Sequence, residues 1–167
     1  GNSGYYGSIG PPGAARDVIT VGATEHDREL AFYSSKGPTH EGYIKPNIAA
    51  IGSSVWSVQN DDAVSGEATY VAYSGTSMAT PMVAGMVALL NEANPDLSPL
   101  MVRSILESTA EYRWLTHPVR PNNDYGWGFP EMDAALAEAE LVDPSINLSL
   151  DPDTPQVTHR ETYDDGN

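Results

Sequence analysis

The chain of 167 residues carries 23 acidic against 8 basic side chains, a formal net charge of −15, and 40% of its residues are hydrophobic. This length and hydrophobic content predict one folded domain with a sizeable core and exclude a disordered chain. The charge disfavours a nucleic-acid partner, because binding phosphates requires clustered Lys and Arg. The absence of cysteine excludes disulfides and thiolate metal sites.

Two interpretations of the acidity stay open. A strongly acidic surface suits high salt, where screening weakens self-repulsion, so the source could be halophilic; the alternative is an acidic protein of ordinary salt conditions. No apolar run reaches the length of a membrane span, and the first residues show no signal-peptide pattern.

The chain begins with turn and loop sequence. Gly1-Asn2-Ser3-Gly4 is rich in residues of tight turns, and an Asn amide there offers two N–H donors without a charge. Residues 5–15, rich in Gly and Pro, continue as a loop. The β-branched run over residues 18–23 then predicts a short buried strand.

An antiparallel pair of strands is predicted over residues 54–58 and 69–74, on either side of an acidic loop. Asp61 and Asp62 in that loop are the kind of ligand that calcium prefers. Adjacent acids in a loop are more often simply solvated, so a structural calcium ion stays open and no metal ligand is assigned.

The most informative stretch runs from Ser74 to Leu90. Its apolar residues recur at helical spacing on two faces, which predicts a helix that is buried nearly all round. Pro81 is tolerated only near a helix start, so the helix begins close to residues 76–78. Ser77 then lies in the first turn, where unpaired N–H groups favour an anion. The simplest role for Ser77 or Thr76 is that of an ordinary N-cap.

Two more helices are predicted downstream. Ser98 and Pro99 form an N-cap and first helical residue, with the helix continuing to about residue 110, and a last helix covers about residues 131–140. The aromatic residues of this region are expected in the core or at its seams: Trp114, Trp127 and Phe129. We place a domain over residues 1–142 and an acidic, Pro-containing tail or linker over 143–167, in which a short strand at 146–150 stays open.

Residues 75–85 match every fixed position of the motif Gly-Thr-Ser-Met-Ala-x-Pro-x-Val-Ala-Gly. This string resembles the nucleophile motif of the subtilisin-like serine proteases, the subtilases. Gly1–Gly4 is similar to the Gly-Asn-x-Gly turn of that family, and further similarity lies in residues 32–38, 45–52 and 125–129. The sequence departs from the family pattern at Asn47, where Asp is usual, and at Ile51, where Pro is usual.

The resemblance implies a partial subtilisin-like α/β fold, a mainly parallel sheet with helices on both faces that is truncated on its N-terminal side. It implies a serine endopeptidase that acts through an acyl-enzyme on Ser77, with a peptide or protein as substrate. The Asn2 side chain would hold the oxyanion with the backbone N–H of Ser77, and Thr76 would assist. Residues Gly1, Asn2, Ser3 and Gly4 would contact substrate, and residues 5–15 would form a wall of its S1 pocket. The family implies no required cofactor and an extracellular location.

The Asp-Thr/Ser-Gly and His-Gly-Thr motifs of the family are absent from the sequence. The four histidines are not followed by Gly-Thr and are expected at the surface: His26, His40, His117 and His159. We therefore expect the Asp and His of the triad, with the early strands, to precede Gly1, so that the chain is an incomplete and inactive catalytic domain whose partner is its missing N-terminal half. Residues 18–23 should then form an edge strand beside exposed apolar surface. A non-catalytic module for peptide binding or assembly on the same scaffold is the second hypothesis.

Overall fold

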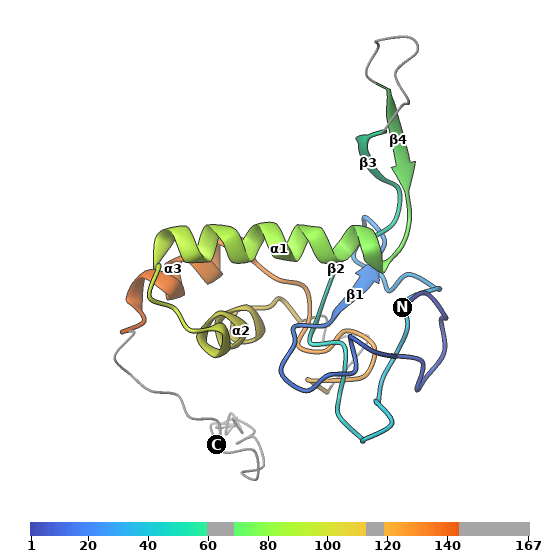
Figure 1. Cartoon of the computed structure of the whole chain (residues 1–167), viewed down its shortest axis with the longest axis horizontal. Coiled ribbons are helices and arrows are strands. Elements are labelled where there is room, and N and C mark those ends of the chain that lie inside the picture. Colours follow the sequence, from blue (N-terminus) through green and yellow to red (C-terminus); the bar gives the residue numbers. More distant parts are fainter. Residues whose placement is uncertain (60–68, 113–118, 144–167) are drawn as a thin grey trace, which may run out of the picture.

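The computed structural model describes residues 1–59, 69–112 and 119–143 (Figure 1). In chain order the elements are β1 (Val21–Thr24), β2 (Ile48–Ile51), β3 (Val55–Val58), β4 (Tyr70–Tyr73), α1 (Thr76–Ala93), α2 (Pro99–Ser108) and α3 (Met132–Leu141). Several residues discussed from the sequence fall outside the described ranges: the acidic pair Asp61 and Asp62, His117, His159, Trp114 and the strand left open at 146–150.

The centre of the fold is a parallel pair of strands. β1 lies beside β2 with Val21 opposite Ile48, and the two strands are almost wholly buried. The predicted strand at 18–23 is thus confirmed, although it begins at Val21. Along the described chain, no second strand pairs with the other edge of β1, as expected for an edge strand. The loop that follows β1 occupies part of that edge, because Ala23 N donates to Ser34 Oγ (3.0 Å) and Ala23 O accepts from Ala31 N (3.0 Å).

The segment Gly126-Trp127-Gly128 lies on the side of β2 away from β1. The Trp127 N–H donates to Asn47 O (2.8 Å), and the Ala49 N–H donates to Gly128 O (2.9 Å). A Cβ on Gly126 would clash with the backbone of Asn47, and this residue also has a positive φ of 62°. Only glycine meets both requirements, so this segment can pack directly on the strand.

The helices build the core on this sheet. α1 packs on β1 and β2, α3 packs on α1, and α2 packs on α3 (Figure 1). The predicted start of α2 is confirmed, because the Ser98 side chain accepts a hydrogen bond from Met101 N (3.3 Å) ahead of Pro99. The predicted last helix is confirmed as α3. None of the helices within the described ranges is long and apolar enough to cross a membrane.

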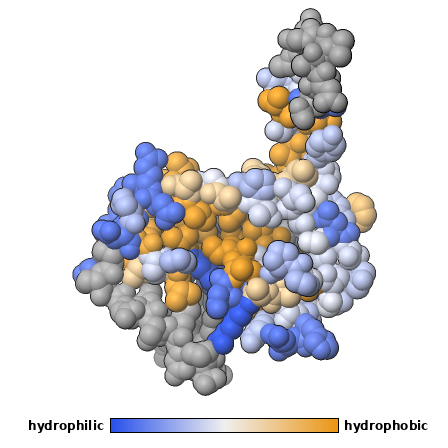
Figure 2. All heavy atoms as spheres, viewed as in Figure 1, coloured by the Kyte–Doolittle hydropathy of each residue, from blue (hydrophilic) through white to orange (hydrophobic). Residues whose placement is uncertain are grey.

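The prediction that α1 is buried nearly all round is wrong. Its buried residues are Thr76, Ala79, Val83 and Leu90, which all lie on one side of the helix. We call Met78, Met82 and Leu89 the outer face of α1; the side chains of Met82 and Leu89 are 42% and 48% exposed. A broad apolar area lies along α1 in Figure 2. The outer face is apolar, but nothing in the described part of the chain covers it.

β3 and β4 form the predicted antiparallel hairpin, with Val55 opposite Tyr73 and Val58 opposite Tyr70. The hairpin projects from the body of the molecule near the start of α1 (Figure 1). Its large side chains stay exposed, among them Trp56 at 70% and Tyr70 at 65%. The chain passes from β4 into α1 within three residues, so the base of the hairpin lies next to Ser77.

Candidate active site

The first turn of α1 is fixed to the end of β2. The Gly75 N–H donates to Gly52 O (2.7 Å), just after the last residue of the strand. A Cβ on Gly52 would lie 2.7 Å from Gly75 O, so a side chain there would force the two segments apart. This close approach places Thr76 and Ser77 at the carboxyl end of the parallel strands, the edge where α/β proteins commonly bind ligands.

The structure brings Asn2 to the same point. Asn2 Oδ1 accepts hydrogen bonds from Thr76 N and from Thr76 Oγ1, both at 2.9 Å. The Gly1 nitrogen also donates to Thr76 Oγ1 (3.1 Å). Because a backbone N–H can only donate, the amide oxygen of Asn2 must face Thr76, which fixes the orientation of the whole amide. The N-cap of α1 is Gly75, which has no side chain to accept a hydrogen bond, and Asn2 supplies the acceptor for Thr76 N from 74 positions earlier.

Two N–H donors therefore flank one small volume. A Cβ built on Gly75 would lie 3.1 Å from Asn2 Nδ2 and 3.7 Å from Ser77 N. Ser77 is the second helical residue, so its N–H has no partner inside the helix. Neither donor is hydrogen-bonded to another residue in the ranges described. Ser77 itself is exposed. Oriented donors at the positive end of a helix dipole suit a developing negative charge.

A pocket of about 250 Å³ adjoins this point. Its lining comes from the N-terminal loop, the start of β1, the segments on either side of residues 36–45 and the first residue of α1: Gly1, Ile9, Gly10, Pro11, Pro12, Gly13, Thr20, Val21, Ser35, Pro46 and Thr76. Gly1 and Thr76 are the two residues bonded to each other beside Asn2. Residues 9–13 of the loop predicted as a wall of the substrate pocket are among these lining residues.

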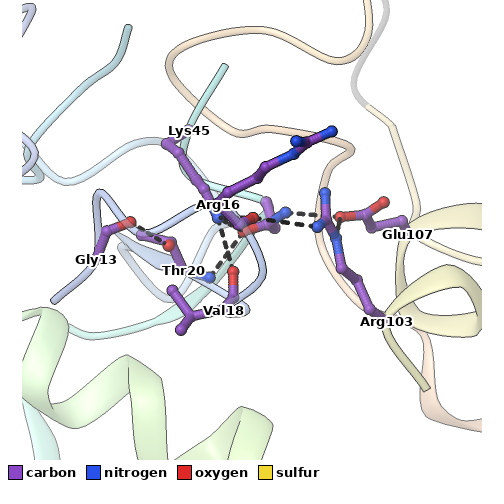
Figure 3. Close-up of polar contacts among 8 residues, drawn as sticks. Gly13, Arg16, Val18, Thr20, Lys45, Arg103 and Glu107 are labelled. Atoms are coloured by element: carbon purple, nitrogen blue, oxygen red, sulfur yellow. Dashed lines mark hydrogen bonds and ion pairs between the residues drawn. The ribbon is translucent and has the colours of Figure 1, made fainter. Parts of the chain in front are cut away.

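A buried polar network adjoins Thr20 and Gly13, two of the residues that line the pocket (Figure 3). The Lys45 side chain is 2% exposed, and its Nζ donates to Val18 O (2.6 Å) and to Asn47 Oδ1 (2.9 Å). Asn47 Nδ2 donates in turn to Glu107 Oε1 (2.7 Å), which also accepts from Arg103 Nε (2.7 Å). Burial, reinforced by the charge of Arg103, lowers the pKa of Lys45 to about 8.

Sequence reasoning missed this network. Its only visible signal was the departure from the family pattern at Asn47, and nothing in the sequence placed α2 beside that residue. The Asn47 amide donates to Glu107, which lies 60 positions away in the chain.

The described histidines do not approach the serine. His26 follows β1 and His40 lies in the loop before β2; both are exposed, and neither is hydrogen-bonded to Ser77. Within the described ranges no group of three or more His, Asp or Glu residues could hold a metal ion. What the structure assembles is a serine with two oriented donors.

Comparisons with known proteins agree with this geometry. The sequence model described as the subtilase family matches residues 1–128. The chain is 34% identical to Bacillopeptidase F of Bacillus subtilis over 93% of its length, and 37% identical to the serine protease AprX of the same organism over 68%. It superimposes on the CspB protease of Clostridium perfringens with a TM-score of 0.71 and 27% identity over 83% of its length.

The chain spans only part of each of these proteins: 11% of Bacillopeptidase F, 29% of AprX and 30% of the CspB chain. The likeness extends over the described fold and includes Asn2 and Ser77, which lie within the matched residues 1–128. From its sequence and its fold alike, the chain belongs to the subtilase family.

Proposed function

We propose that the chain is part of a serine endopeptidase in which Ser77 is the nucleophile. One observation carries the proposal: the Asn2 amide is locked by Thr76 so that its N–H group lies beside the N–H of Ser77. The base and the aspartate that orients it would come from protein outside these 167 residues, because neither family motif occurs in the sequence.

The chemistry follows from these positions. Ser77 Oγ attacks the carbonyl carbon of a peptide bond and gives its proton to the base. The carbonyl oxygen becomes an oxyanion that accepts hydrogen bonds from Ser77 N and Asn2 Nδ2. Collapse of this intermediate breaks the C–N bond, the amine leaves with the proton, and water hydrolyses the acyl-enzyme.

Thr76 supports this step by holding the Asn2 side chain. Its N–H and its hydroxyl hold the Asn2 oxygen, so the amide keeps one orientation before and during the reaction. A donor that is already oriented needs no reorganisation when charge develops, which is the main source of such stabilisation. Gly1 to Gly4 and the adjoining pocket would contact the peptide substrate.

The outer face of α1 supports the proposal that more protein completes this domain. The exposed Met82 and Leu89 form an apolar surface of the kind that folded proteins cover, and no described strand pairs with the second edge of β1. We propose that the covering protein carries the base. An extracellular location and the lack of a required cofactor complete the proposal, by analogy with the family.

The test uses the full-length gene product and an unstructured protein substrate such as casein. Ser77→Ala should abolish cleavage and labelling by a fluorophosphonate probe. Ser74→Ala is the matched control, because it removes a nearby hydroxyl that accepts from Ser54 N (2.9 Å) at the base of the hairpin, and it should retain both activities. Cleavage that persists in Ser77→Ala would refute the proposal. Peptide binding with no cleavage by the unmutated protein would favour the non-catalytic binding module instead.

A further inference from the structure

We propose that Asn47 is a positioning residue that sets the pocket wall through Thr20, and that Glu107 makes an amide necessary at this position. The inference rests on the proposed function, because it assigns the pocket beside Ser77 to substrate. It gives a role to the residue at which the chain departs from the family pattern.

A continuous series of hydrogen bonds joins Asn47 to the pocket (Figure 3). Asn47 Oδ1 accepts from Thr20 N at 2.8 Å, and Thr20 Oγ1 donates to Gly13 O at 2.6 Å. Thr20 and Gly13 both line the pocket, and the loop that includes Gly13 forms one of its walls. The Asn47 side chain therefore helps to hold that loop against the sheet, together with the backbone hydrogen bond from Asn47 N to Thr20 O (2.8 Å).

The Asn47 nitrogen explains why aspartate could not replace asparagine at this position. Asn47 is 3% exposed, and its Nδ2 donates to Glu107 Oε1 at 2.7 Å. In Asn47→Asp a carboxylate oxygen would replace that nitrogen, and two carboxylates would face each other in a buried site. Lys45 and Arg103 are already engaged on either side, with Asn47 Oδ1 and Glu107 Oε1 respectively. The introduced oxygen would be left without a donor, and buried polar atoms without partners are costly.

The expected defect concerns the binding of substrate. The oxyanion donors are held by separate contacts, the Asn2 amide by Thr76 and the start of α1 by Gly52. A shift of Thr20 and Gly13 would change the shape of the pocket and leave these contacts in place. Asn47→Asp should therefore raise KM more than it lowers kcat.

The experiment measures steady-state cleavage of short chromogenic peptides by the full-length gene product. We expect Asn47→Asp to raise KM by about 10-fold, the effect of one unsatisfied buried group, with a much smaller change in kcat. Glu107→Gln alone should have little effect, because its amide oxygen can still accept from Asn47. The double variant Asn47→Asp with Glu107→Gln should recover most of the loss, because the introduced amide can donate to the introduced carboxylate.

A matched control separates positioning from stability. Asn94 also donates from a partly buried amide, to Ala139 O (2.9 Å) and Val142 O (3.2 Å), far from the pocket lining in the fold. Asn94→Asp should lower the melting temperature without raising KM. If Asn47→Asp leaves KM unchanged, or if the double variant is no better than the single one, the proposal is overturned.

A second measurement keeps the proposal independent of catalysis. Hydrogen–deuterium exchange of the peptide covering residues 10–24 should be faster in Asn47→Asp and slower again in the double variant. If the protein shows no Ser77-dependent cleavage, the proposed function fails, while the exchange data still decide whether Asn47 and Glu107 position the loop. Should the single variant not fold, a double variant that folds with normal exchange supports the pair, and one that also fails to fold overturns it.

Discussion

At the scale of single residues, the site depends on how one amide is turned. Asn2 has an oxygen that accepts and a nitrogen that donates, and Thr76 binds the oxygen twice. The nitrogen is thereby directed to the volume beside Gly75, where Ser77 N also lies. Asn2 thus accepts at the start of the helix through its oxygen, and in the proposed function its nitrogen donates to the substrate.

Asn2→Asp tests whether the Asn2 oxygen and the Asn2 nitrogen have these two separate roles. The variant keeps an oxygen for Thr76 but replaces the donor with a second acceptor. In the full-length gene product we expect kcat to fall by roughly 10²–10³, as it does for one such donor in the related protease subtilisin, with little change in KM. Introduced into Ser77→Ala, the same change should have no further effect on cleavage. A kcat within a few-fold of the unmutated value would contradict the role of Asn2.

Lys45 predicts a dependence of stability on pH. Its pKa is lowered to about 8 by burial, below the ordinary value of 10.5 that applies to the unfolded chain. Between these values the unfolded state binds more protons, so this residue makes the free energy of unfolding rise from pH 8 to pH 10.5. Below pH 8 Lys45 is protonated in both the folded and the unfolded state, so burial of its charge lowers the free energy of unfolding by the full amount. The difference in urea stability between the parent and Lys45→Met should therefore change over this interval, and a constant difference would contradict the lowered pKa.

At the scale of elements, one side of α1 packs in the core and the opposite side is exposed to solvent in the described structure. Leu90 is 0% exposed and packs in the core, whereas Leu89, the residue before it, is 48% exposed on the outer face. Both are leucines in the same helical turn, so they share propensity and differ only in surroundings. An apolar side chain on an uncovered face contributes little to stability, since it stays partly in water.

The two leucines form a matched pair for measuring what covers α1. In the 167-residue chain, Leu90→Ala should lower the free energy of unfolding by about 2–5 kcal/mol, and Leu89→Ala by less than about 1 kcal/mol. In the full-length gene product the cost of Leu89→Ala should rise toward that of Leu90→Ala. Equal, small costs of Leu89→Ala in both proteins would show that the outer face remains uncovered. Urea denaturation followed by circular dichroism provides both values.

At the scale of the whole molecule, the fold has a core but leaves several apolar surfaces open. The outer face of α1 and the exposed aromatic side chains of the hairpin lie outside that core. The net charge of −15 opposes association through self-repulsion, and added salt weakens this protection. The chain by itself thus combines surfaces that favour association with a charge that resists it.

We expect the 167-residue chain to self-associate and to show no cleavage that depends on Ser77. Sedimentation velocity should show a mass that grows with concentration and with salt. The double variant Met82→Gln with Leu89→Gln should reduce this growth, because it makes the outer face of α1 polar. A chain that stays monomeric at high salt, or that cleaves casein through Ser77, would contradict this expectation.

The sequence by itself determined the family, the candidate nucleophile and most element positions, because these depend on local signals. A motif of adjacent residues identified Ser77, Pro81 located the start of α1, and Ser98 with Pro99 located the start of α2. Only the tertiary structure decided how Asn2 is oriented, which side of α1 is covered, and why Asn47 is an amide. Each of these depends on a partner distant in the chain, such as Thr76 for Asn2 and Glu107 for Asn47. Apolar spacing states that a face can be buried, but its burial requires a neighbour, and the described fold provides none for the outer face of α1.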